Sequence, residues 1–184
     1  MNTLTSGQLD EKAWFEQAVA ALADSGPTGQ TSAEYIRQHR IPLGFTPQRN
    51  TGASWFDWRK LRRGVFLRTT YAQRQPDDPW PYALIAHEAK HLEQGIMEAL
   101  SVRGELIAWQ LQYDVLEESS TAPFPRHVWQ ELRALAPHAR ADLKRARLLM
   151  KQIAGEGYRI DWLPLWPLLA EVAHRLKTLG QQPE

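Results

Sequence analysis

Apolar residues recur at helical spacing along most of this 184-residue chain, and prolines and glycines mark the points where a helix must stop. The pattern predicts a first helix capped by Asp10, a short second one opened by Thr31, a third from about Trp80 to Gln94 and a fourth over 98–118. After Pro125 the remaining sequence is mostly helical as well. The chain is therefore expected to be dominated by helices.

Two segments between the second and third predicted helices favour β-structure instead. Ser54–Leu61 and Val65–Tyr71 have the alternation that is typical of strands, and the three residues 62–64 between them are few enough for a hairpin. Residues 43–53 show no period and are expected to form a loop. Together these elements predict a helix-dominated α+β fold with a small sheet or hairpin.

Length and composition narrow the class of protein. The length suits a single domain over residues 1–184, with a core at 43–118 that holds the sheet and two helices, and a helical C-terminal part at 125–184. The 22 Lys+Arg residues nearly balance the 21 Asp+Glu residues, which argues against a general nucleic-acid binder. No apolar run approaches the ~20 residues of a membrane helix. Since the N-terminal region also lacks a signal-peptide core, we expect a cytoplasmic protein with neither nucleic acid nor membrane as partner.

The segment that carries chemistry is His-Glu-Ala-Lys-His at 87–91, on the third predicted helix. A separation of four residues places His87 and His91 on one helix face about one turn (~6 Å) apart, where both imidazoles can bind one zinc ion. Glu88 lies beside that face and is placed to contact a water on the ion rather than the ion itself. A bound cation lowers the pKa of its water, and a carboxylate that is not a ligand can accept the proton as the water attacks a carbonyl. The segment thus predicts a zinc-dependent hydrolase with Glu88 as general base.

A zinc site of this kind needs a third protein ligand, and the sequence contains no cysteine that could supply it. Glu98 is too far along the axis, ~10 Å from His91 if the helix continues unbroken. Glu105 is the better candidate because it lies on the following helix, which a turn around 95–100 could fold back toward the histidines. His87, His91 and Glu105 are therefore the predicted metal ligands.

The 87–91 motif followed by Glu105 resembles, in a minimal form, the gluzincin branch of the zincin metallopeptidases. The resemblance covers roughly residues 64–118. It implies a small sheet over the active-site helix, a Zn²⁺ ion held by two histidines and the glutamate, and Glu88 as the base. It also implies an edge strand beside a cleft for an extended peptide or protein substrate, and Val65–Tyr71 matches that position.

Two other interpretations stay open at the level of sequence. The domain could bind zinc without catalysing a reaction and recognise a protein partner through the same groove. Alternatively, it could be a metal-free helical interaction module whose histidines lie on a solvated helix face. Tyr71 or Tyr158 could donate to an oxyanion or be ordinary packed aromatics, and Ser101 or Gln112 could support the ligand histidines.

Overall fold

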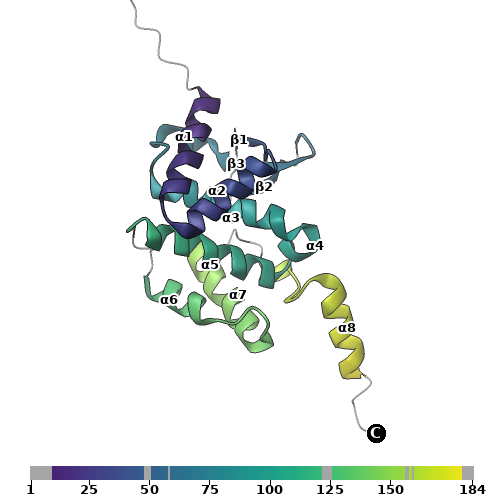
Figure 1. Ribbon diagram of the computed structural model, residues 1–184. Helices are drawn as coiled ribbons and strands as arrows, with labels where there is room; N and C mark the ends of the chain where they lie inside the picture. The colour runs from purple at the N-terminus through teal and green to yellow at the C-terminus, as the bar shows by residue number, and fades with distance from the viewer. Residues whose placement is uncertain are drawn as a thin grey trace, which may run out of the picture.

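The computed structural model describes residues 10–47, 51–57, 59–121, 126–155, 158 and 160–179 (Figure 1). Within these ranges helices dominate and one small sheet is present, as the sequence predicts. The elements are, in chain order, α1 (Glu11–Asp24), α2 (Pro27–Gln38), β1 (Leu43–Thr46), β2 (Ala53–Asp57), β3 (Arg62–Arg68), the 3-10 helix η1 (Thr69–Gln73), α3 (Pro79–Gln94), α4 (Ile96–Ala99), α5 (Val102–Glu118), α6 (Arg126–Ala134), α7 (Arg140–Ala154), the 3-10 helix η2 (Ile160–Trp162) and α8 (Leu168–Leu179).

The sheet has the strand order β1-β3-β2, so that β3 is its central strand. β3 runs antiparallel to β2 and parallel to β1, whose Leu43 lies opposite Val65. The antiparallel pair confirms the predicted hairpin but not its link, because β2 ends at Asp57 and residues 62–64, the predicted link, are the first residues of β3. Val65 and its two successors Phe66 and Leu67 are all fully buried, which a strand with neighbours on both edges and packing on both faces allows.

Two sequence-based predictions about this region are wrong. Residues 43–53 are not wholly a loop, because 43–46 form β1, a strand too short to show a period. Val65–Tyr71 is not an edge strand: its first part belongs to central β3 and its last residues turn into η1. Alternation along one strand reports which side chains are buried and says nothing about how many strands flank it. Trp58, which was assigned to the first strand segment, lies outside the described residues.

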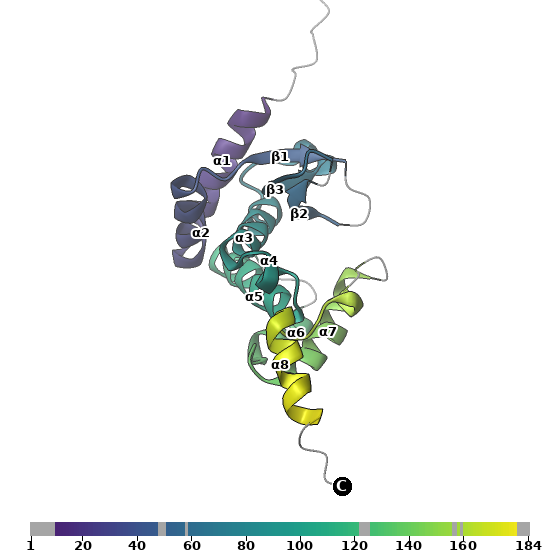
Figure 2. The same cartoon turned by 90° about the vertical axis from the view of Figure 1, so that its right-hand side faces the viewer.

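Helix α3 lies at the centre of the molecule. The Asp78 carboxylate accepts a hydrogen bond from the backbone N–H of Trp80 at 3.0 Å, and Pro79 occupies the first turn, as predicted for the start of this helix. Gly95 ends it with a positive φ of 76°. Strands β2 and β3 contact α3 on one side and α5 contacts it on another, while α6 and α7 pack on α5 (Figure 2). The predicted third helix is thus confirmed, and it lies between the sheet and α5.

Two predicted helix boundaries need correction. The second helix begins at Pro27 rather than Thr31, whose hydroxyl donates back to the Pro27 carbonyl inside the helix instead of capping it. The single helix predicted over 98–118 is divided into α4 and α5, because the Ser101 hydroxyl accepts from the backbone N–H of Gly104 at 3.0 Å and caps a new helix. No helix among the described residues is long and apolar enough to cross a membrane.

Candidate metal centre

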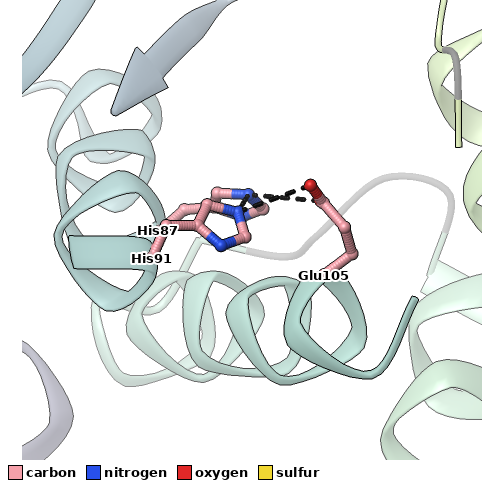
Figure 3. A group of neighbouring side chains, drawn as sticks. All are labelled: His87, His91 and Glu105. Carbon is pink, nitrogen blue, oxygen red and sulfur yellow. Dashed lines mark hydrogen bonds and ion pairs between the residues drawn. The ribbon is translucent and has the colours of Figure 1, made fainter. Parts of the chain in front are cut away.

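His87 and His91 on α3 point toward Glu105 on α5, and the three side chains meet between the two helices (Figure 3). The Nε2 atoms of the histidines lie 3.1 Å apart. Glu105 Oε2 lies 3.8 Å from His87 Nε2, and its Oε1 lies 3.6 Å from His91 Nε2. The predicted proximity of Glu105 to both histidines, from a separate helix, is therefore confirmed.

These separations suit a small cation with tetrahedral coordination. Ligand atoms bound to zinc at ~2.0–2.1 Å and at tetrahedral angles lie about 3.4 Å from one another. The distances from His91 Nε2 to His87 Nε2 and to Glu105 Oε1 are close to this value, and the 3.8 Å contact of His87 Nε2 is with the other oxygen of Glu105. The two acidic residues that could have replaced Glu105 are engaged elsewhere. Glu98 forms an ion pair with Arg103 at 2.9 Å, and Asp114 faces Arg133 at 3.7 Å. Among the described residues, Glu105 is the carboxylate that joins the two imidazoles.

The hydrogen bonds around His91 determine which of its ring nitrogens is free for a metal. Its Nδ1 atom lies 3.1 Å from Gln94 Oε1, while Gln94 Nε2 donates to the Gly104 carbonyl at 3.0 Å. Since the amide must present its NH₂ group to that carbonyl, its oxygen faces the ring, and Nδ1 must carry the ring hydrogen. The lone pair of His91 then lies on Nε2, the atom directed at His87 and Glu105. Gln94 is a supporting residue that sequence reasoning missed.

His87 is buried, with 7% of its surface exposed. Burial lowers its pKa well below the usual value, and the neighbouring His91 lowers it further, while the side chain of Gln112 and the backbone of Ala108 act in the opposite direction. The low pKa keeps the imidazole neutral, which is the form that binds metals. Its buried Nδ1 forms no hydrogen bond of normal geometry. Of the two predicted supporting residues, Gln112 faces His87, whereas Ser101 caps α5.

Glu88 lies beside the three candidate ligands and is not one of them. Its carboxyl group is buried, and this burial raises its pKa well above the usual value, with a further contribution from Glu105. A hydrogen bond from the backbone of Trp55 acts against the rise. Trp55 lies where the register between β2 and β3 shifts, and such irregularities redirect backbone groups away from the sheet. The position suits a proton acceptor that is held in place by β2.

An aromatic pair completes the surroundings of Glu105. The Tyr158 hydroxyl donates to Glu105 Oε2 and accepts a hydrogen bond from the Trp109 indole N–H at 3.2 Å. Desolvation raises the pKa of Tyr158 well above its usual value, and the Glu105 carboxylate raises it further. Within the described part of the chain, Tyr71 forms no hydrogen bond with Glu105. Its own pKa is raised mainly by burial.

A cavity of about 610 Å³ opens onto the centre and gives a second molecule access to it. Strand β2 forms one wall along 53–57, and His87, Glu88, His91 and Glu105 form the floor. Aromatic side chains line much of the remainder: Trp55, Phe56, Tyr71, Trp80, Trp109 and Tyr158. A slightly larger cavity of about 640 Å³ between α1, α2 and β1 includes none of the three candidate ligands.

The structure thus brings together all four residues predicted to form the site and adds Gln94, Trp55 and Trp109 around them. It places Tyr158, one of the two tyrosines considered as oxyanion donors, against Glu105. No short-range pattern in the sequence indicates that the three added residues contact the centre, because each contact depends on how separate elements pack. Comparison of the chain with models of protein families, with curated proteins and with solved structures finds no match.

Proposed function

We propose that this protein is a zinc-dependent metallopeptidase of the gluzincin type. The observation that carries the proposal is the convergence of His87, His91 and Glu105 next to a buried carboxylate, Glu88, on the floor of an open cavity. Two neutral imidazoles and one carboxylate are the donor set of many catalytic zinc sites. The orientation of Gln94, which leaves the Nε2 lone pair of His91 directed at the other two ligands, fits a cation there.

Zinc bound at these residues would polarise a substrate carbonyl and lower the pKa of a bound water. In this proposal Glu88 accepts the proton of the attacking water and passes it to the leaving amine. The backbone of Trp55 holds the Glu88 carboxylate toward the cavity through its hydrogen bond.

The peptide-binding role that the resemblance assigned to Val65–Tyr71 belongs to β2 in this proposal. Among the described residues β2 pairs with β3, and its residues 53–57 line the cavity beside His91 and Glu88. Main-chain hydrogen bonds to a strand are one way in which proteins bind an extended peptide. We therefore infer that the substrate is an unfolded or flexible polypeptide segment.

The decisive experiment separates zinc binding from catalysis. We expect purified wild-type protein to contain one zinc ion and to cleave a fluorescently quenched library of unstructured peptides. Glu88→Gln should retain the zinc and reduce hydrolysis by at least about 10²-fold, since general-base catalysis typically contributes 10²–10⁴-fold. His91→Ala, as the matched control, should lose both zinc and hydrolysis.

The other outcomes select between the remaining interpretations. If wild type and Glu88→Gln both contain zinc and neither cleaves peptide, the protein is a zinc-binding recognition domain. Wild-type protein that neither contains zinc nor takes it up would overturn the proposal and leave a metal-free interaction module.

A further inference from the structure

Tyr158 reaches the candidate metal centre from outside the two helices that carry the ligands. It follows α7, whereas the ligands lie on α3 and α5. Its hydroxyl contacts Glu105 on one side and Trp109, four residues further along α5, on the other. Residues four apart lie on the same face of a helix, so α5 presents the ligand and the indole to Tyr158 together.

The donors and acceptors in this chain of hydrogen bonds can be ordered in only one way. The indole N–H of Trp109 is a donor only, so the Tyr158 oxygen must accept from it. The single hydroxyl hydrogen of Tyr158 is then available for Glu105, whose Oε2 accepts it. Trp109 therefore directs the Tyr158 hydroxyl toward the carboxylate.

The contact engages one particular oxygen of Glu105. Tyr158 donates to Oε2, and Oε1 is the oxygen that lies 3.6 Å from His91 Nε2. A carboxylate held by one oxygen cannot rotate freely about its last bond, so Oε1 stays directed at His91, while Oε2 remains 3.8 Å from His87 Nε2. Without this hydrogen bond, the Glu105 side chain would have to lose that rotational freedom when a metal binds.

The main chain of the segment after α7 is hydrogen-bonded both to the end of α7 and to the start of α5. The N–H of Tyr158 donates to the Gly155 carbonyl at 3.1 Å. A few residues later, the carbonyls of Pro164 and Leu165 accept from the N–H groups of Val102 and Arg103 at 2.8 and 3.1 Å. These two bonds satisfy N–H groups in the first turn of α5, next to Glu105. The segment that follows α7 is thus bound to α5 both through the tyrosine and through its main chain.

We propose that Tyr158 is a positioning residue that orients the Glu105 carboxylate for metal binding, so that the C-terminal part of the chain completes a centre whose ligands all precede it. This inference rests on the proposed zinc site. It does not require that the protein hydrolyse anything.

The test measures zinc affinity in the full-length chain by competition with a chromogenic chelator. Tyr158→Phe keeps the ring and removes the hydroxyl, and we expect it to weaken zinc binding about 10-fold or more, since loss of a group that supports a ligand typically costs 10–100-fold. Tyr71→Phe is the matched control, because Tyr71 lines the same cavity and should leave the affinity unchanged. The visible absorption spectrum of the Co²⁺-substituted protein should change in Tyr158→Phe and not in the control.

A double substitution tests whether Tyr158 acts through Glu105. In a Glu105→Gln background, Tyr158→Phe should cause little further loss of affinity, because the interaction is already removed. The proposal would be overturned if the losses of zinc affinity from the two substitutions were fully additive. It would also be overturned if Tyr158→Phe kept the wild-type zinc affinity and the wild-type Co²⁺ spectrum.

Two further controls keep the test decisive. If Tyr158→Phe loses its native circular dichroism spectrum, Trp109→Phe replaces it, since this variant leaves the hydroxyl but removes its orienting donor. An unchanged affinity in Trp109→Phe would then count against the inference, and a reduced one would support it. A wild-type chain that binds no zinc would refute the proposed function itself, which is a separate result.

Discussion

Glu98 and Glu105 are seven residues apart, and their side chains have different surroundings. Glu98 is paired with Arg103, whereas Glu105 is 13% exposed and faces the imidazoles of His87 and His91 and a tyrosine hydroxyl. Among the described residues no Lys or Arg side chain pairs with Glu105, and burying a carboxylate is costly unless charges or hydrogen bonds compensate it. The zinc ion of the proposed function would supply such a charge.

The two glutamates allow a matched comparison. Glu105→Gln should weaken zinc binding by at least about 10-fold, because a neutral amide is a poorer zinc ligand than a carboxylate. Glu98→Gln makes the same chemical change on the preceding short helix and should leave zinc affinity at the wild-type value. Isothermal titration of metal-free protein measures both. Equal affinities in the two variants would remove Glu105 from the ligand set.

At the scale of elements, the turn between α3 and α4 decides whether α5 can return to α3. Gly95 makes this turn with φ 76° and ψ 167°, a conformation that is accessible almost only to glycine. A Cβ atom added to Gly95 would meet no atom within 4 Å, so any cost of a substitution there is conformational and not steric. The glycine thus allows a direct test of the turn.

Gly95→Ala should destabilise the fold by about 1–3 kcal/mol, the usual cost of a residue held in a sparsely populated region. It should also weaken zinc binding, because relief of the strain would displace α5 and its Glu105 from the histidines. Urea denaturation and zinc titration measure the two effects. A stability and an affinity both equal to those of wild type would show that the turn does not hold the ligands together.

At the scale of the whole molecule, a metal at this centre would link α3 with α5, two helices that contact each other directly and hold much of the core between them. A ligand that binds only the folded state stabilises it by about 2.7 kcal/mol at a concentration 100 times its dissociation constant. Metal binding would therefore raise the free energy of unfolding of the whole domain, and its effect would not be confined to the side chains of the site.

We therefore expect zinc at 100 times its dissociation constant to raise the melting temperature of metal-free protein by roughly 5–11 °C. A change of 1 kcal/mol in the free energy of unfolding shifts the melting temperature of a chain of this size by about 2–4 °C. A chelator should reverse the shift, and His91→Ala should show none. Differential scanning calorimetry is the measurement. A similar shift in His91→Ala would mean that zinc stabilises the protein at some other place.

The sequence alone determined those features that depend on near neighbours in the chain. The spacing of His87 and His91 requires a shared face on any α-helix, and Asp78 with Pro79 predicts where that helix begins. The choice of Glu105 over Glu98 rested on the length of an unbroken helix, whereas in the structure the helix ends at Gly95 and Glu98 pairs with Arg103. The predominance of helices and the β2–β3 hairpin were equally readable, because periodicity and short links are local properties.

Only the tertiary structure decided which distant groups meet. β1 is too short to show a period, and its parallel pairing with β3 made β2 the strand at the cavity. The contacts of Gln94 with His91 and of Tyr158 with Glu105 arise from the packing of α5 against α3 and of the segment after α7 against α5. Such contacts depend on turn geometry and on side-chain packing between elements, and neither leaves a repeating pattern in the chain.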